Sequence, residues 1–220
     1  MRISRHLAYA LIGVCLSLSA CVTWADDATN LNLAVSRDES YGLSQMLEKG
    51  VDPNLKEPQR GETPLMIAIR EKSMRSLQVL LASPKIDIEA SANNGDTALM
   101  IASYTHNTEA VKALLAHDAE VNRHGWAPLH YAAAVGDADI VKLLLDKSAY
   151  IDAESPNKTT PLMMAARGGQ TETAKVLIEA GADVSLKNDQ GLNAVDVALK
   201  NDHRDTADLI KSALKPPPGK

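Results

Sequence analysis

The 220-residue sequence contains no phenylalanine, and Phe, Trp and Tyr together make up 3% of it. A core built on clustered aromatic rings is therefore excluded, and aliphatic residues and alanine must supply the packing. Only two cysteines occur, Cys15 and Cys21, and both precede residue 26. The rest of the chain cannot form a disulfide, so burial of apolar side chains must stabilise it.

Motifs of catalysis are also missing. The six histidines are scattered, and none lies at a recognised spacing from a carboxylate and a nucleophile. Gly168-Gly169 falls between two helical patterns rather than after a strand, which argues against a phosphate-binding loop. His117 and His124 flank one loop, but two ligands without a third make only a weak metal site. We therefore expect a non-enzyme with no cofactor and no metal.

One six-residue pattern is present five times. Its second position falls at residues 64, 98, 128, 161 and 194, so successive copies are 34, 30, 33 and 33 residues apart. A period of this length is typical of a repeat fold. The five copies are Thr63–Ala68, Thr97–Ala102, Ala127–Ala132, Thr160–Ala165 and Asn193–Ala198.

Each period holds two short apolar helical patterns, and neither can bury its apolar face alone. In the third copy, Leu129 and Ala132 mark a first helix, whereas Ile140 and Leu144 recur at helical spacing in a second. The pattern resembles an exported bacterial member of the ankyrin-repeat family over nearly the whole chain after residue 30. The resemblance implies an all-α ankyrin-repeat solenoid of stacked helix-turn-helix units with short β-hairpin-like fingers and about six helix pairs.

The repeat register divides the chain into six units between a signal peptide and a tail. Residues 1–25 form the signal peptide, and the proline-rich residues 215–220 are expected to be disordered. We expect the two terminal units to act as caps with one polar face. The units are an N-terminal cap at 26–58, repeats at 59–92, 93–122, 123–155 and 156–188, and a C-terminal cap at 189–214.

Local signals predict where the helices begin and end. Thr63-Pro64 and Thr160-Pro161 are typical helix starts, because Thr caps and Pro in the first turn loses no hydrogen bond. Gly50 and Gly181 follow second-helix patterns and are expected in the left-handed conformation. The alanine that ends each copy of the pattern lets neighbouring helices approach closely.

An export signal precedes the repeats. Arg2 and Arg5 come before an apolar run at residues 7–20, which is too short to span a bilayer comfortably. Two processing routes stay open: cleavage before Cys21 with lipidation of its thiol, since residues 18–21 resemble a lipobox, or ordinary cleavage after Ala25. The sequence thus predicts a periplasmic protein, either soluble or lipid-anchored to the envelope through Cys21.

Charge narrows the choice of partner. Removal of residues 1–25 leaves 21 basic and 28 acidic residues, a formal charge of −7. A nucleic-acid binder would need a basic stripe to replace phosphate counterions, so we expect no interaction with nucleic acid.

The resemblance implies that partners bind the concave face, which the fingers and the exposed side of the first helices form. Glu62 is among the variable surface positions on this register. Trp, Tyr and Arg are the residue types most enriched in binding hot spots. The residues that we expect to bind a protein are Arg70, Tyr104, Arg123, His124, Trp126 and Arg167.

The 30-residue step indicates a shortened finger at residues 121–126. Such a finger would leave Trp126 and Arg123 beside Tyr104, forming an anchor pocket. Alternatively, Trp126 only covers the repeat interface where the finger is missing. His130 occupies the family's usual histidine position, but Ala127 replaces its usual threonine partner, which puts their usual hydrogen bonding in doubt.

We therefore predict a non-enzymatic protein–protein interaction module in the bacterial cell envelope, which acts as a monomer on an unidentified protein. Three alternatives stay open: an immunity or inhibitor protein against an envelope-targeting toxin, an accessory factor for an envelope enzyme, and a secreted host-directed effector. Contact with a membrane is expected only through a lipid on Cys21.

Overall fold

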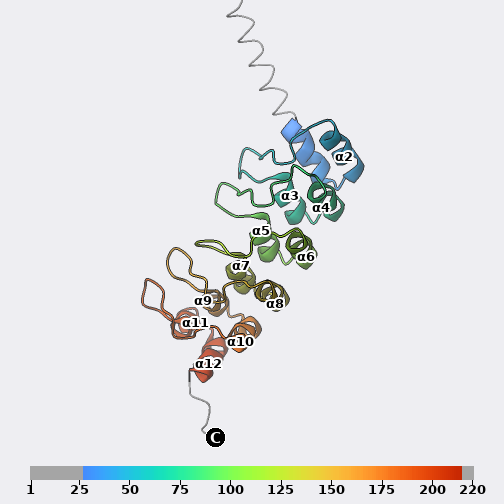
Figure 1. Ribbon diagram of the computed structural model, residues 1–220. Coiled ribbons are helices and arrows are strands. Elements are labelled where there is room, and N and C mark those ends of the chain that lie inside the picture. Colours follow the sequence, from blue (N-terminus) through green and yellow to red (C-terminus); the bar gives the residue numbers. More distant parts are fainter. Residues whose placement is uncertain (1–26, 215–220) are drawn as a thin grey trace, which may run out of the picture. The chain divides into compact units, whose positions relative to one another are not determined.

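The computed structural model describes residues 27–214, and the regular structure in that range is helical throughout. Residues 27–36 are helical and pair with α2; five further pairs follow, each a shorter first and a longer second helix (Figure 1). The six predicted helix pairs are confirmed. The bounds are α2 Ser40–Glu48, α3 Pro64–Arg70, α4 Met74–Leu81, α5 Ala98–Tyr104, α6 Thr108–Ala116, α7 Pro128–Val135, α8 Ala138–Asp146, α9 Pro161–Arg167, α10 Thr171–Glu179, α11 Ala194–Lys200 and α12 Arg204–Ala213.

The predicted signal peptide at residues 1–25, with Cys21, and the tail at 215–220 lie outside the described residues. Within 27–214, no helix combines the length and the apolar character needed to cross a membrane.

Contacts between residues divide the chain into two compact units, and each is described by itself. Unit 1 comprises Met1–Asp87 and Ala92–Asn94, and unit 2 comprises Ile88–Ser91 and Gly95–Lys220. Helices α2 to α4 therefore belong to unit 1, and α5 to α12 belong to unit 2.

In unit 1, α4 packs against both α2 and α3. Leu31, Leu65 and Leu77 have no exposed surface, and full burial of one such side chain contributes about 1.5–3 kcal/mol. Asp38 ties two repeats together. Its carboxylate accepts the backbone N–H of Ser76 at 2.7 Å and the Nε–H of Arg75 at 2.9 Å, and so caps the first turn of α4.

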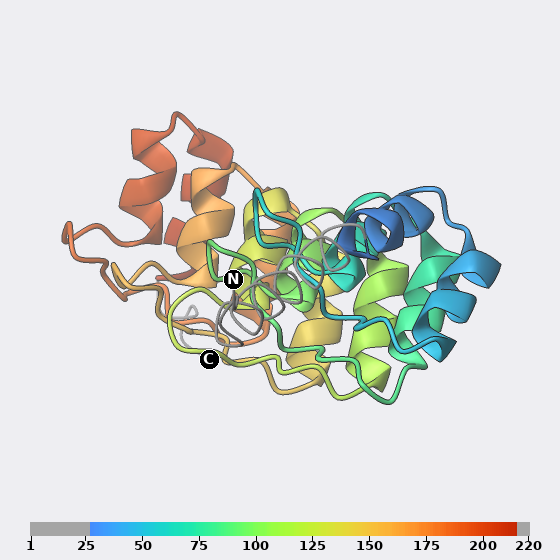
Figure 2. The same cartoon turned by 90° about the horizontal axis from the view of Figure 1, so that it is seen from above.

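In unit 2, the helices form two rows. The first helices α5, α7, α9 and α11 pack in succession, and the second helices α6, α8, α10 and α12 do the same. Helices α10 to α12, orange to red, lie together in both Figure 1 and Figure 2. The repeated alanine position allows this close packing, since Ala102, Ala132, Ala165 and Ala198 have no exposed surface.

Caps and prolines start the first helices as predicted. The Oγ1 atoms of Thr63 and Thr160 each accept a backbone N–H three residues on, and a proline follows each threonine. Second helices use other caps: Asn107 accepts from Ala110 N at 3.1 Å at the start of α6, and Asp137 accepts from Ile140 N at 3.0 Å at the start of α8.

A residue with positive φ joins the first and second helix of every pair. The sequence prediction that Gly50 and Gly181 adopt this conformation after second helices is confirmed, with φ of 93° and 99°. Only two of the six junction residues are glycine, so four side chains adopt a conformation that most residues avoid. The six are Asp38, Lys72, His106, Gly136, Gly169 and Asp202, with φ between 54° and 83°.

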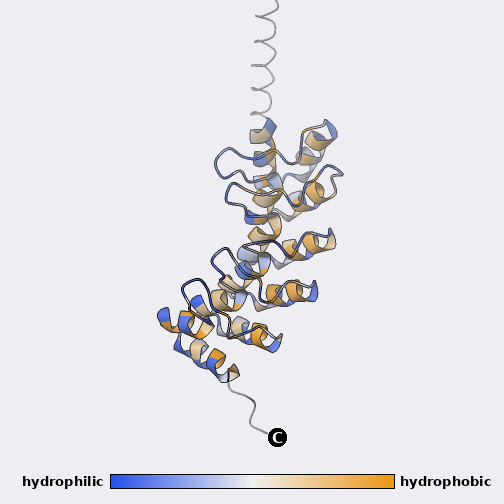
Figure 3. Cartoon of the chain, turned by 60° about the vertical axis from the view of Figure 1, so that its left-hand side comes forward, coloured by the Kyte–Doolittle hydropathy of each residue, from blue (hydrophilic) through white to orange (hydrophobic). Residues whose placement is uncertain are grey.

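The loops that follow the second helices are hairpin-like, but they consist of turns and contain no strand within residues 27–214. In three of them a backbone hydrogen bond joins the two sides of the loop: Glu57 N to Glu62 O at 2.9 Å, Ser155 N to Thr159 O at 3.1 Å and Asn188 N to Leu192 O at 3.0 Å. The loops are mostly hydrophilic, whereas apolar residues concentrate on the helices (Figure 3).

Candidate functional site

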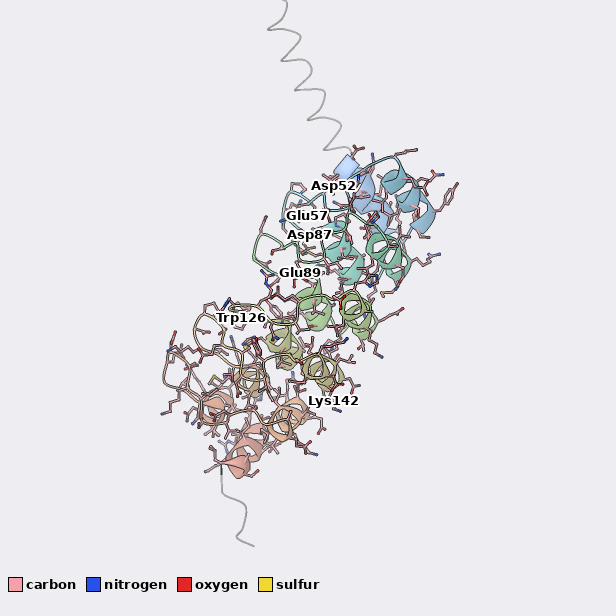
Figure 4. All side chains as sticks on the ribbon, in the orientation of Figure 1. Asp52, Glu57, Asp87, Glu89, Trp126 and Lys142 are labelled. Carbon is pink, nitrogen blue, oxygen red and sulfur yellow. The ribbon has the colours of Figure 1, made fainter. Side chains whose placement is uncertain are left out.

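A pocket of about 200 Å³ opens beside the first helices of unit 2. Its walls come from α5, α7 and α9 and from the shortened loop that precedes α7. Trp126, from this loop, lies on the loop side of unit 2, whereas Lys142 on α8 lies on the other side (Figure 4). The residues that line this aromatic pocket are Tyr104, Trp126, His130, Tyr131, Ala134 and Met164.

The ring of Tyr131 packs edge-to-face against two other rings of the aromatic pocket. The ring centroid of Tyr131 lies 6.3 Å from that of Tyr104 at an interplanar angle of 89°. It lies 6.4 Å from that of Trp126 at 68°. Edge-to-face pairs of this kind contribute about 0.5–1.5 kcal/mol each beyond burial. Tyr104 nevertheless keeps 55% of its surface exposed and Trp126 keeps 36%, so the rings are oriented while apolar surface stays in water.

His130 is the fully buried member of the aromatic pocket. Its Nδ1 accepts the backbone N–H of Ala127 at 3.2 Å, and its Nε2–H donates to the carbonyl oxygen of Thr159 at 2.9 Å. Burial lowers the pKa of His130 below its usual value of 6.5, because a charged ring would lose its hydration. The ring is therefore neutral at pH 7, with its proton on Nε2. The predicted loss of the usual partner at Ala127 is compensated by these backbone contacts.

A carboxylate lies one hydrogen bond from the aromatic pocket. The hydroxyl of Tyr131 donates to Oδ1 of Asp96. Partial burial and this neighbouring negative charge raise the pKa of Tyr131, so its hydroxyl stays protonated and continues to donate. Asp96 thus places a negative charge at the hydroxyl end of the Tyr131 ring.

Two of the six predicted binding residues, Tyr104 and Trp126, line the aromatic pocket together. Arg123 does not line it, and the ring that packs against Tyr104 is that of Tyr131. The side chain of Arg123 is partly covered, and its Nη1 atom is buried without a hydrogen-bond partner among the described residues. His124 is exposed on the same loop and does not line the pocket.

Arg70 belongs to unit 1, apart from the other five. Its Nε–H donates to Oε2 of Glu62 at 3.3 Å, and Glu62 is only 6% exposed. The expectation that Glu62 is a variable surface position is therefore wrong, because this carboxylate is enclosed and paired with Arg70 and, at 3.9 Å, with Arg60. The main role of Arg70 is therefore to neutralise the charge of the Glu62 carboxylate.

Arg167 is exposed at the end of α9 and lines a second pocket of unit 2, of about 250 Å³. This pocket is polar, with Asn157, Asn188 and Lys200 also in its wall. Arg167 and Trp126 therefore serve different pockets.

Sequence reasoning missed four residues of the aromatic pocket. His130 and Tyr131 directly follow Pro128-Leu129 in the repeated pattern, so the sequence places them on the first helix but does not show that they line a pocket. Ala134 and Met164 carried no signal, because only packing of α7 against α9 brings them together.

Among residues 27–214, no group of three His, Cys, Asp or Glu side chains converges. His117 instead places Nδ1 2.9 Å from the carbonyl oxygen of Ala113, within its own helix.

The stacked helix pairs and the surface pocket define a class of repeat proteins that bind partners through an extended face. The chain belongs to the ankyrin-repeat family: the family model "Ankyrin repeats (3 copies)" matches residues 31–123, 75–155 and 151–216.

Curated relatives share the repeats but are much longer. Human transient receptor potential cation channel subfamily A member 1 is 30% identical over 167 residues, which cover 71% of this chain and 15% of the relative. Human SH3 and multiple ankyrin repeat domains protein 2 is 32% identical over 164 residues, which cover 72% and 9%. The chain thus spans less than a sixth of either relative.

Two solved structures are similar over most of their length. The ankyrin repeat domain of Bcl-3, a member of the IkappaB protein family, has a TM-score of 0.72 and 28% identity, covering 82% of this chain and 81% of that chain. A chain of the Bd0816 predatory endopeptidase from Bdellovibrio bacteriovorus in complex with immunity protein Bd3460 also has a TM-score of 0.72 and 28% identity. That match covers 83% of this chain and 96% of the other.

Proposed function

We propose that the chain is a non-enzymatic protein-binding module of the bacterial cell envelope, and that its partner docks on the aromatic pocket of unit 2. One observation carries the proposal: the exposed rings of Tyr104 and Trp126 are held edge-on by Tyr131. Side chains that are oriented before binding lose little conformational freedom on association, so they convert buried area into affinity efficiently.

Two further features support the proposal. Helix-pair repeat proteins present extended surfaces and act chiefly through them, so the ankyrin family is generally a non-enzymatic interaction scaffold. The basic and apolar segment at residues 1–20 supports export to the envelope.

The test is affinity capture from envelope extract with the tagged full chain. The double variant Tyr104→Ala/Trp126→Ala removes both exposed rings, whereas Tyr41→Ala/Tyr150→Ala removes two tyrosines, 77% and 68% exposed, that do not line the pocket. We expect wild type and the Tyr41/Tyr150 variant to retain the same protein. The Tyr104/Trp126 variant should retain at least tenfold less of it, as truncation of a hot spot does.

Equal retention by all three chains would contradict docking at this pocket. Circular dichroism and thermal melting of the variants separate loss of the surface from loss of the fold. Location is tested independently by envelope fractionation and by incorporation of labelled palmitate into wild type and Cys21→Ser.

A more specific function is favoured by one comparison. One similar structure, in which the match covers 96% of the other chain, is a complex of an endopeptidase and an immunity protein. We infer as a second candidate that the partner is an exported peptidase of the same cell, and that docking covers its active site.

This candidate predicts stoichiometric inhibition of endopeptidase activity in fractionated envelope extract. The Tyr104→Ala/Trp126→Ala chain should inhibit at least tenfold less strongly. If no fraction is inhibited while capture by wild type persists, the immunity function fails and the docking function stands.

A further inference from the structure

The aromatic pocket combines features that suit a positive charge. Its rings offer electron-rich faces in more than one orientation, since Tyr131 is nearly perpendicular to Tyr104 and strongly inclined to Trp126. A cation near such faces is attracted by about 0.5–2 kcal/mol, more as it loses water. The carboxylate of Asp96, which accepts a hydrogen bond from the Tyr131 hydroxyl, adds a formal negative charge beside one of the lining rings.

The negative charge of the protein concentrates in the same unit. The described residues of unit 2, 88–91 and 95–214, include 18 acidic against 11 basic side chains, a formal balance of −7. Those of unit 1, 27–87 and 92–94, include 9 acidic against 8 basic ones, a balance of −1. A basic partner is therefore drawn toward the unit that holds the aromatic pocket.

Among the described residues 27–214, no lysine or arginine lines this pocket. Arg123 and Arg167 do not line it. His130, its buried member, stays neutral at pH 7 because burial lowers its pKa. The pocket volume of about 200 Å³ suits one side chain rather than a helix or a strand.

We propose that the aromatic pocket binds a single lysine or arginine side chain of the partner protein. The inference rests on the proposed docking function and names the chemistry of the residue that anchors it. The methylene stem contacts Met164 and Ala134, and the charged head lies among the rings near Asp96.

The test uses the fluorescence of Trp126 in the full chain carrying Trp24→Phe, which leaves one tryptophan. The probes are Nα-acetyl-lysine amide and Nα-acetyl-arginine amide, with Nα-acetyl-norleucine amide as the neutral control of matched shape. At constant ionic strength we expect saturable binding of the basic probes in the millimolar range. At least one basic probe should bind about fivefold or more tightly than the norleucine probe.

Three variants locate the effect. Asp96→Asn keeps a hydrogen-bond acceptor for Tyr131 but removes the charge, so it should weaken the basic probes about threefold and leave the norleucine probe unchanged. Tyr104→Leu removes one ring and should weaken the basic probes more than the neutral one. Tyr150→Phe, outside the pocket, should change nothing.

If the norleucine probe binds as tightly as the basic probes or more tightly, the inference is overturned and the pocket is an apolar anchor. The docking function is then still decided separately by the capture experiment on envelope extract. Absence of binding by every probe, or basic binding that Asp96→Asn and Tyr104→Leu leave intact, also overturns the inference.

Discussion

His130 joins two repeats through a single ring: its Nε2 lies 2.9 Å from the carbonyl oxygen of Thr159, and its Nδ1 accepts from Ala127 N. The preceding repeat has methionine at this position, and there the N–H of Thr97 points at Sδ of Met100, 3.5 Å away. A sulfur accepts weakly and donates nothing, so only the histidine reaches the next loop.

We expect His130→Met to lower the free energy of unfolding by about 1–3 kcal/mol at pH 7.5, because the Thr159 carbonyl loses its donor. The folded pKa of His130 lies below the unfolded value of 6.5, so its stabilisation is complete above pH 6.5 and is lost as pH falls through the folded pKa. Urea unfolding at pH 7.5 and pH 5 should show a smaller acid loss in the variant. If the variant loses as much unfolding free energy between pH 7.5 and pH 5 as wild type does, groups other than His130 cause the loss.

Ala132 has no exposed surface at the junction of first helices, and Ala132→Leu should cost about 1–3 kcal/mol by overpacking. Ala116→Leu makes the same exchange at an exposed position of α6 and should stay within about 0.5 kcal/mol of wild type. Thermal melting compares the two. Equal melting temperatures would mean that the first helices separate at little cost.

Lys72 has φ of 57° between α3 and α4, which costs a side chain about 1–2 kcal/mol relative to glycine. Lys72→Gly should therefore raise the free energy of unfolding by about 0.5–1 kcal/mol after the entropy of glycine is subtracted. The control Lys49→Gly, at the C-cap of α2 where φ is an ordinary right-handed −75°, should lower it. Chemical denaturation measures both, and destabilisation by Lys72→Gly would refute the strain at this junction.

Burial alone would raise the pKa of Asp38, but hydrogen bonds from Arg75 and Ser76 outweigh it and lower the pKa. Its stabilisation is complete above the unfolded value of 3.8 and is lost as pH falls through the folded pKa. Asp38→Asn should thus destabilise the protein at pH 7, and the difference from wild type should vanish in strong acid. The exposed control Asp146→Asn should stay within about 0.5 kcal/mol of wild type at pH 7.

The sequence predicted the helix pairs because their signals are local. Thr63 and Thr160 cap helices at the predicted starts, and the alanine of each pattern is buried. These features depend on residues within one period, so a 33-residue window contains nearly all the necessary information.

The site was predicted less completely, because it depends on side-chain direction in an irregular loop. Trp126 and Tyr104 were found from their repeat positions and residue types. Arg123 does not line the pocket, and the repeat register alone does not fix the direction of a side chain in an irregular loop. Tyr131 was missed, because its bond to Asp96 of the preceding repeat has no local signature.

The hydrogen bonds that link repeats in unit 2 all have short reach along the chain. His130 and Thr159 are 29 positions apart, His106 and Asp137 are 31, and Gln170 and Ala134 are 36. A protein in which each repeat contacts only the adjacent repeats has low contact order and can unfold from one end, one repeat at a time. The terminal pair α11 and α12 can therefore unfold transiently while the aromatic pocket, built on α5, α7 and α9, keeps its shape and stays ready to bind.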